Sequence, residues 1–299
     1  MSFSEVVRVS TPMLEVAYQE AGDPGGLPVV LLHGFPYDVR AYDGVEPTLA
    51  DAGLRVIAPY LRGYGETRFR DPEAVRSGQQ AALGQDLLEL MDALEIERAI
   101  VAGYDWGGRA ACIAAALWPE RVHGLVTVDG YNMQDIAHSG EPTKPEWEAT
   151  YWYQYYFHSE RGREGLERNR DELCEYLWRT WSPEWADAAA AFPASAASLH
   201  NPDFVDVVIH SYRHRFGLVA GDPRYDAVEA RIAQQPVISV PTVVLEGGAD
   251  GVGGPRGADD PEERALFTGA YQHRVLPGIG HNVPQEAPAD FAAAVLELV

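Results

Sequence analysis

The chain has 299 residues, of which 46% are hydrophobic, enough to bury one large core and to carry a sizeable insertion. Its 45 acidic and 23 basic side chains give a net charge of −22, which makes binding to nucleic-acid phosphates or to an anionic membrane surface unfavourable. We therefore expect a small-molecule substrate, and neither a nucleic-acid nor a membrane partner.

Cysteine and lysine usage excludes several further classes of protein. Cys112 and Cys174 are far apart and lack metal-type spacing, so neither a disulfide framework nor a zinc site is indicated. Lys144 is the only lysine, which argues against Schiff-base chemistry and against a Walker A loop. The first residues lack the features of a signal peptide, and no apolar run is long enough to span a bilayer. We predict a cytoplasmic protein without a metal or organic cofactor, whose only protein partner would be a second copy in a homodimer.

The first 131 residues alternate predicted strands with predicted helices. Alternating apolar and polar residues over 6–18, with Thr11-Pro12 at the turn, predict an antiparallel hairpin. A continuous apolar run, typical of a strand buried on both faces, occupies 28–32, and further strands are predicted at 54–59, 100–103 and 122–128. Helical patterns cover 41–52 and 85–94. This order predicts an α/β fold in which helices cover both faces of a mostly parallel sheet.

The alternation stops near Tyr131. Residues 132–219 are helical in tendency and hold five of the seven tryptophans, which are Trp147, Trp152, Trp178, Trp181 and Trp185. We predict that this segment forms a helical cap on a core made of 1–131 and 220–299. Most of the rings are expected to form the core of the cap, and the aromatic content favours an apolar or aromatic substrate. The core pattern resumes with helices at 227–232 and 262–267, strands at 241–245 and 273–276, and a final helix from residue 290.

The most informative stretch is Gly103-Tyr104-Asp105-Trp106-Gly107-Gly108, which joins a strand to a helix of small residues. Its glycines allow a sharp turn that exposes the central residue at the tip. That residue is Asp105, whose carboxylate can attack a reactive carbon electrophile and form an ester. The N-terminus of the following helix would stabilise the anion. The alternative is an ordinary turn in which Asp105 caps the helix.

Hydrolysis of such an ester requires a base that activates water and an acid that orients the base. His281 lies in a glycine-flanked loop after the last predicted strand, and Asp250 follows the strand at 241–245. Asp129, at the end of the strand at 122–128, is the alternative acid. Because the carboxyl ends of parallel strands meet at one edge of a sheet, we expect these side chains to lie beside Asp105.

A second glycine turn, His33-Gly34-Phe35-Pro36, follows the strand at 28–32. Gly34 allows the backbone to approach a ligand closely, so the Phe35 N–H can serve as one oxyanion donor. The N–H of Trp106, at the start of the helix after the elbow, is the predicted second donor. The alternative is a plain Gly/Pro turn that binds nothing.

Four motifs carry a resemblance to a known family, and they are His33-Gly34-Phe35-Pro36, Arg62-Gly63-Tyr64-Gly65, the elbow around Asp105, and Gly280-His281. Over nearly its whole length the chain resembles α/β-hydrolases of the epoxide hydrolase and haloalkane or haloacetate dehalogenase group. Its order of nucleophile, acid and histidine is also that of α/β-hydrolases. The resemblance implies an eight-stranded, mostly parallel sheet, an inserted cap, and a covalent ester on the nucleophile. One departure is Tyr104, where epoxide hydrolases usually carry histidine.

The resemblance also implies the residues that contact the substrate. Epoxide hydrolases polarise the epoxide oxygen with two cap tyrosines, and the segments 152–157 and 211–213 resemble those that carry them. We predict that Tyr153 and Tyr212 have this role, with Tyr155 or Tyr156 as alternatives to Tyr153. The further substrate contacts that we expect are His33, Trp106 and Trp152. The resulting prediction is an epoxide hydrolase that converts an apolar or aromatic epoxide into a vicinal diol.

Dehalogenation by the same nucleophile is the main alternative. Trp106 stands where haloalkane dehalogenases carry a halide-binding tryptophan, but Phe35 replaces their second donor. Haloacetate dehalogenases bind a substrate carboxylate with two arginines near the nucleophile. Arg109 matches one of these and Trp106 replaces the other, so a surface ion pair is the alternative role of Arg109. A non-catalytic ligand-binding protein on this scaffold is the third alternative.

Overall fold

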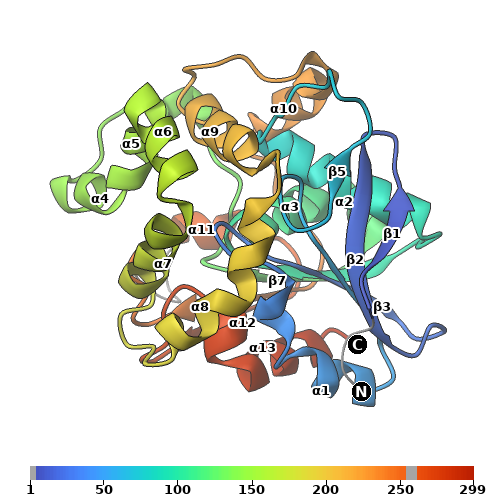
Figure 1. Ribbon diagram of the computed structural model, residues 1–299. Coiled ribbons are helices and arrows are strands. Elements are labelled where there is room, and N and C mark those ends of the chain that lie inside the picture. The colour runs from blue at the N-terminus through green and yellow to red at the C-terminus, as the bar shows by residue number, and fades with distance from the viewer. Residues whose placement is uncertain (1–4, 254–260) are drawn as a thin grey trace.

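The computed structural model describes residues 5–253 and 261–299 (Figure 1). Within these ranges a nine-stranded sheet forms the centre, in the order β1-β2-β4-β3-β6-β7-β8-β9, with β5 paired to β2. The strands are β1 (Val7–Ser10), β2 (Leu14–Gly22), β3 (Pro28–Leu32), β4 (Arg55–Pro59), β5 (Arg68–Phe69), β6 (Ala99–Gly103), β7 (Val122–Val128), β8 (Thr242–Gly247) and β9 (Tyr271–Leu276). The predicted α/β architecture is confirmed.

The strand directions explain where the site lies. β1 and β2 form the expected antiparallel hairpin, and β2 is also antiparallel to β4. All the pairings from β4 and β3 through β9 are parallel, so the carboxyl ends of six successive strands lie along one edge of the sheet. The expected number of eight strands is wrong, because β5 adds a ninth alongside Leu14 and Glu15. A two-residue strand is too short to show an alternation in sequence.

Helices cover both faces of the sheet (Figure 1). One face is covered by α2 (Gln80–Ala93), α3 (Asp105–Leu117) and α10 (Asp226–Ile232), which pack on one another, and the other by α1 (Glu46–Asp51) and α13 (Pro288–Leu296). The short helices α11 (Pro261–Ala265) and α12 (Val283–Glu286) complete the core. The single helix predicted at 41–52 is instead a 3₁₀ turn, Val39–Tyr42, followed by α1. Pro47 in the first turn of α1 explains this separate start.

Between β7 and α10 the chain is described throughout and contains helices but no strand. The α-helices are α4 (Pro145–Thr150), α5 (Trp152–His158), α6 (Glu160–Arg168), α7 (Arg170–Trp181), α8 (Ala188–Ala196) and α9 (Phe204–His214). They lie over the carboxyl edge of the sheet (Figure 1). We call this helical segment the cap, and its boundaries at 132 and 219 stay a prediction.

Hydrogen bonds to backbone groups attach the cap to the loops that follow β3, β8 and β9. The indole N–H of Trp178 donates to the carbonyl of Pro36 at 2.9 Å. The carbonyl of Trp181 accepts from the N–H groups of Gly251, at 2.9 Å, and His281, at 3.2 Å. The loops that follow β3, β8 and β9 therefore each contact α7.

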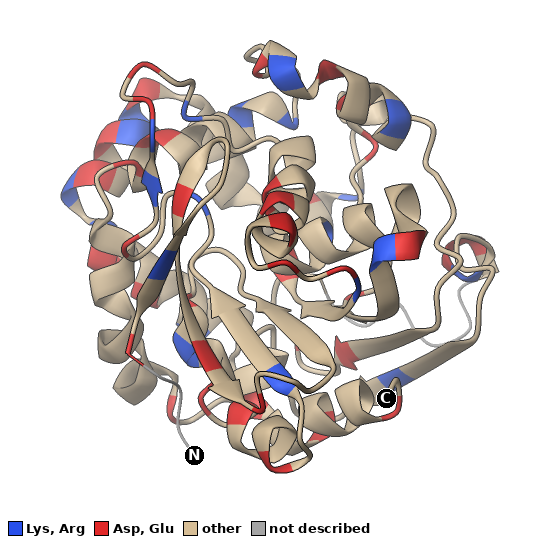
Figure 2. Cartoon of the chain, turned by 90° about the vertical axis from the view of Figure 1, so that its right-hand side faces the viewer, with Lys and Arg blue, Asp and Glu red and all other residues tan. Residues whose placement is uncertain are grey.

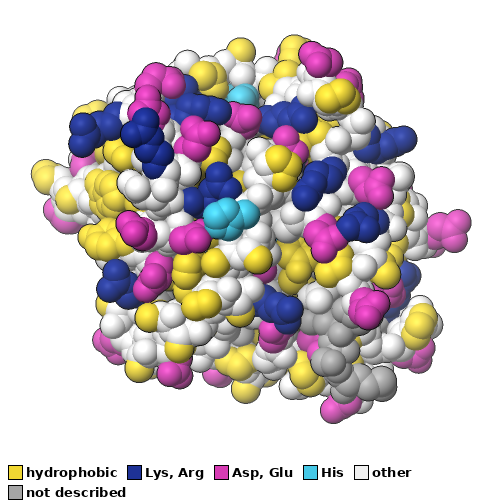
Figure 3. Space-filling model, viewed as in Figure 1, with side chains coloured by type: hydrophobic (Ala, Val, Ile, Leu, Met, Phe, Trp, Pro, Cys, Tyr) yellow, Lys and Arg dark blue, Asp and Glu magenta, His cyan; other side chains and the backbone are white. Residues whose placement is uncertain are grey.

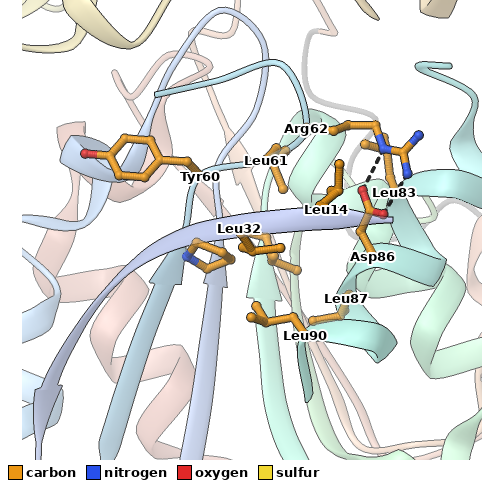
Figure 4. A pocket seen from close by; sticks show the side chains of 11 residues that line it. Leu14, Leu32, Tyr60, Leu61, Arg62, Leu83, Asp86, Leu87 and Leu90 are labelled. Atoms are coloured by element: carbon orange, nitrogen blue, oxygen red, sulfur yellow. Dashed lines mark hydrogen bonds and ion pairs between the residues drawn. The ribbon is translucent and has the colours of Figure 1, made fainter. Parts of the chain in front are cut away.

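The Arg62-Gly63-Tyr64-Gly65 motif has a structural role. The Arg62 guanidinium is buried and donates to both carboxylate oxygens of Asp86, each at 2.6 Å, beside a cavity of about 20 Å³ under β2 (Figure 4). It also donates to the Ser77 carbonyl and the Tyr225 hydroxyl. A cavity of this size holds about one water molecule, so this ion pair connects the loop after β4 to α2 rather than forming a substrate site.

Acidic residues occur on several helices and loops of the side of the molecule shown in Figure 2. Within the ranges given above, no helix combines the length and apolar character needed to cross a bilayer.

Candidate active site

Asp105 lies at a strained turn between β6 and α3. Its φ angle is +49°, in the left-handed region that non-glycine residues seldom adopt. A side chain at Gly107 would lie 1.9 Å from the Leu32 carbonyl oxygen, and one at Gly34 would lie 2.5 Å from the Asp105 Cβ. These glycines are therefore required for the close approach of the two turns. The elbow predicted from the sequence is present, with the Asp105 carboxylate at its tip.

The two carboxylate oxygens of Asp105 have different environments. Oδ1 accepts a hydrogen bond from the Phe35 N–H at 2.7 Å, whereas Oδ2 lies 3.8 Å from His281 Nε2. The Trp106 N–H lies in the first turn of α3, where a helix provides no backbone acceptor for it. Burial alone would raise the pKa of Asp105, but the facing His281 and the Phe35 N–H lower it below its ordinary value. Asp105 is therefore an anion at neutral pH.

His281 is held by Asp250. Its Nδ1 lies 2.9 Å from Asp250 Oδ2, while the N–H groups of Val252 and Gly253 donate to Asp250 Oδ1 at 2.7 and 3.3 Å. Burial would lower the pKa of His281, but the Asp250 and Asp105 carboxylates raise it well above its ordinary value. The hydrogen bond to Asp250 fixes the proton on Nδ1 and leaves Nε2 facing the nucleophile. This is the arrangement that a general base needs.

Asp129, the alternative acid, is also close. Its Oδ2 is 3.7 Å from His281 Nδ1, too far for a hydrogen bond. Burial and the neighbouring Asp250 charge raise the pKa of Asp129 well above its ordinary value, whereas His281 helps to lower that of Asp250. The geometry therefore favours Asp250 as the orienting acid. These three side chains could also hold a metal ion, but a metal on Nδ1 would displace the proton shared with Asp250.

The two predicted cap tyrosines meet above the nucleophile. Tyr153, on α5, and Tyr212, on α9, are buried, with ring centroids 5.4 Å apart, and both rings contact that of Phe35. Burial raises the pKa of both hydroxyls, which therefore keep their protons and can donate. The Tyr153 hydroxyl accepts from Gln154 at 3.1 Å, while the Tyr212 hydroxyl has no partner in the described part of the chain. The alternative Tyr155 is exposed and donates to Glu148.

A cavity of about 300 Å³ opens onto Asp105. Its charged and amide lining residues are Asp105, Arg109, Asp129, Asn132, Gln134, Gln154 and Arg215, and its other lining residues are Tyr131, Met133, Tyr151, Tyr153, Phe216, Val252 and Gly253. None of the five cap tryptophans is among them. This lining agrees with the expectation that most of these rings form the core of the cap, and it places charged and amide side chains beside aromatic ones near Asp105.

Trp152 and His33 do not line this cavity, contrary to the substrate contacts that we expected from the resemblance. Trp152 is 39% exposed, and its ring packs on that of Tyr176. Hydrophobic side chains lie on the left of the face shown in Figure 3. Consecutive residues of a helix point about 100° apart, so Tyr153 faces inward and Trp152 outward. His33 is buried, and its ring nitrogens contact the Gly34 carbonyl and the Leu61 N–H, so it holds the turn.

The oxyanion role of the Trp106 backbone N–H stays a prediction, and the Trp106 side chain lies in the aromatic cluster behind Asp105. Its ring contacts those of Phe35 and Tyr212, with centroids 5.8 and 6.0 Å apart. The indole Nε1 is buried and has no hydrogen-bond partner among the described residues.

Sequence reasoning did not identify Arg215 or Gln154 as residues of the site. Arg215 follows Tyr212 by three positions at the end of α9, the spacing that brings two side chains to one side of a helix, so this signal was present. Gln154 follows Tyr153 directly, and no periodicity indicates that both face the cavity.

Comparison with known proteins decides the family. The family model described as the alpha/beta hydrolase fold matches residues 28–288. The chain belongs to this family. Its sequence is 27% identical to epoxide hydrolase A of Mycobacterium tuberculosis, over 97% of this chain and 96% of that protein. This membership makes the protein a hydrolase, and the ligand-binding alternative is not supported.

Two solved structures extend the comparison. A Klebsiella pneumoniae protein, provisionally named an epoxide hydrolase, is 44% identical and superposes with a TM-score of 0.96, over 99% of this chain and 98% of that one. Epoxide hydrolase A of Mycobacterium thermoresistibile covers 99% of this chain and 98% of its own, with a TM-score of 0.76 and 23% identity, a likeness that concerns the fold alone. The predicted resemblance to the epoxide hydrolase group is confirmed.

Proposed function

We propose that this hydrolase opens epoxides to vicinal diols through an ester on Asp105. The observation that supports this most directly is the unequal environment of the two Asp105 oxygens, one bound by the Phe35 N–H and the other facing His281 and free to attack. Relatives named epoxide hydrolase support the same reaction. The substrate is a small molecule that fits a cavity of about 300 Å³.

In the first step, Asp105 Oδ2 forms a bond to an epoxide carbon while that carbon's bond to the ring oxygen breaks. The oxygen takes a proton from Tyr153 or Tyr212 as it becomes an alcohol. Ester formation removes the negative charge of Asp105, which is one cause of the raised pKa of His281. The pKa of His281 therefore falls in the intermediate, so the imidazolium can give its proton to the tyrosinate left by the first step and then act as a base.

In the second step, His281 Nε2 removes a proton from water, which attacks the ester carbonyl carbon. The oxyanion forms at the former Oδ1, beside the Phe35 and Trp106 N–H groups. Collapse of this intermediate breaks the ester bond to the substrate, whose alcohol takes the proton from His281. The diol leaves, and the proton that remains on the Asp105 carboxyl group passes to His281, which restores the Asp105 carboxylate. Asp250 keeps the imidazole oriented and stabilises its charged form.

Dehalogenation is the second candidate, because the buried Trp106 Nε1 without a partner could donate to a leaving halide. The deciding experiment offers the purified protein an aryl epoxide, a haloalkane and a haloacetate in parallel, with Asp105→Ala as the control. Diol from the epoxide, absent in the control, is the expected result. Halide release without diol would exclude the proposal in favour of a dehalogenase.

A further inference from the structure

Two arginines lie at the cavity that contains the nucleophile. Arg109 comes from α3, one turn after Asp105, and Arg215 follows α9 in the cap. Arg215 is only 7% exposed, and its guanidinium carbon lies 4.3 Å from the centre of the Tyr212 ring. Two cations from different parts of the fold therefore converge on one small space.

Neither arginine has an anionic partner. In the ranges that the structure describes, no carboxylate oxygen lies within 4.0 Å of either guanidinium, and the Nε of each is buried without a hydrogen-bond partner. Arg109 donates to the Gln134 side-chain oxygen at 3.2 Å, and Arg215 to the Ser211 hydroxyl at 3.2 Å. A neutral amide and a hydroxyl do not balance two buried positive charges.

The charges of the two arginines also act on each other. Burial and the nearby Arg215 lower the pKa of Arg109 to about 10. Arg109 therefore stays charged at neutral pH, but its charge is less favourable there than in water. Buried charges in proteins are normally paired, and removing the partner leaves a strong binding site for an anion. A planar carboxylate matches the paired N–H groups of a guanidinium better than other small anions of similar size.

We propose that the substrate of this hydrolase carries a carboxylate, which Arg109 and Arg215 bind while its epoxide lies against Asp105. The inference rests on the proposed epoxide hydrolysis and names its substrate class. Asp105 and Arg109 are four residues apart on one helix, a rise of about 6 Å. A substrate whose carboxylate lies roughly this far from its epoxide carbon can reach Arg109 while the epoxide contacts Asp105. This adds a carboxylate to the apolar or aromatic epoxide expected from the sequence.

The test compares styrene oxide that bears a para carboxylate with the same epoxide that bears a para carboxamide. The two differ in charge and little in size. We expect kcat/KM of the unaltered enzyme to be at least about tenfold higher for the carboxylate, because charge-assisted hydrogen bonds are lost in the amide. In Arg215→Gln and Arg109→Gln the ratio of kcat/KM for the carboxylate to kcat/KM for the carboxamide should fall to about three or less.

Arg168→Gln is the matched control, because it removes one positive charge from the cap at an exposed position. It should keep the full preference. A second measurement needs no variant: benzoate should inhibit diol formation by the unaltered enzyme at least about tenfold more strongly than benzamide. Diol from both epoxides at equal kcat/KM would overturn the carboxylate site and leave the proposed function intact. Absence of diol from both would overturn the proposed function and this inference together.

Discussion

The loops of the sheet's carboxyl edge and the helices of the cap contribute different kinds of polar group to one cavity. On the sheet side, Asp105, Asp250 and His281 are held by one another and by backbone N–H groups. On the cap side, the Tyr212 hydroxyl and the Arg215 Nε are buried without a partner in the described residues. Apart from His281 Nε2, which also lacks a hydrogen-bond partner among the described residues, the sheet side is held in place before a substrate arrives, whereas these two cap groups can gain a partner from one. Substitutions on the sheet side should lower the activity toward every substrate, and substitutions on the cap side should lower it toward some substrates only.

The largest effect should come from His281→Ala. Without the base the ester forms on Asp105 but is not hydrolysed, so turnover should fall by about a thousandfold or more. Intact-mass spectrometry should show the protein heavier by the mass of one substrate. Asp105→Ala is the control and should gain no mass. A His281→Ala protein that stays unmodified in the presence of a substrate would contradict this order of steps.

A smaller loss of activity should distinguish the roles of Asp250 and Asp129, the two acids beside the His281 imidazole. Asp250→Asn removes the charge that orients His281, and we expect kcat to fall by about a hundredfold. Asp129→Asn should lower kcat less than about tenfold, since Asp129 Oδ2 lies 3.7 Å from His281 Nδ1, beyond hydrogen-bond distance. Steady-state kinetics at pH 7 compares them. A larger loss in Asp129→Asn would assign the orienting role to Asp129.

On the cap side, Tyr153→Phe and Tyr212→Phe should each lower kcat/KM for an epoxide by about tenfold to a hundredfold, because each removes one donor to the leaving oxygen. Neither should matter for a haloalkane, whose leaving group needs no proton. Tyr155→Phe, at an exposed position on the same helix, is the control and should behave as the unaltered protein. Equal losses for both substrates would indicate a packing role for the tyrosines.

The smallest effect concerns the junction of the two regions. Asp38, on the core, is buried and accepts hydrogen bonds from Ser195 and Ser198 of the cap, and burial raises its pKa from 3.8 to about 6. Because the folded state binds this proton more tightly, the contribution of Asp38 to stability is greatest below pH 4 and is lost as the pH rises through 6. The shift of roughly two units corresponds to about 3 kcal/mol.

Asp38→Asn should remove this dependence. Relative to the unaltered protein, the free energy of unfolding of the variant should rise by up to about 3 kcal/mol between pH 4 and pH 7.5. Urea denaturation at the two pH values measures the change. If the free energies of unfolding of the two proteins differ by the same amount at both pH values, the prediction is contradicted.

The features of the fold and site that were predicted correctly from the sequence depend on patterns of neighbouring residues. The buried strands and the glycines around Asp105 determine the elbow from a few adjacent residues, and parallel strands bring Asp250 and His281 to the same edge. The direction of a cap side chain depends instead on how a short helix is rotated against the core. This is why Trp152 was expected at the cavity and Arg215 was not, although Tyr153 and Tyr212 were expected there.

The Trp181 carbonyl, which accepts from both the Gly251 and the His281 N–H groups, limits how such a cap can be exchanged. In a chimera that carries the cap of a relative, the loops of the acid and the base would lose their shared acceptor unless the new helix offers a carbonyl at the same point. The cap is therefore not an independent module. Divergence of substrate preference can proceed by side-chain replacement on α5 and α9, while the backbone at the end of α7 stays constrained.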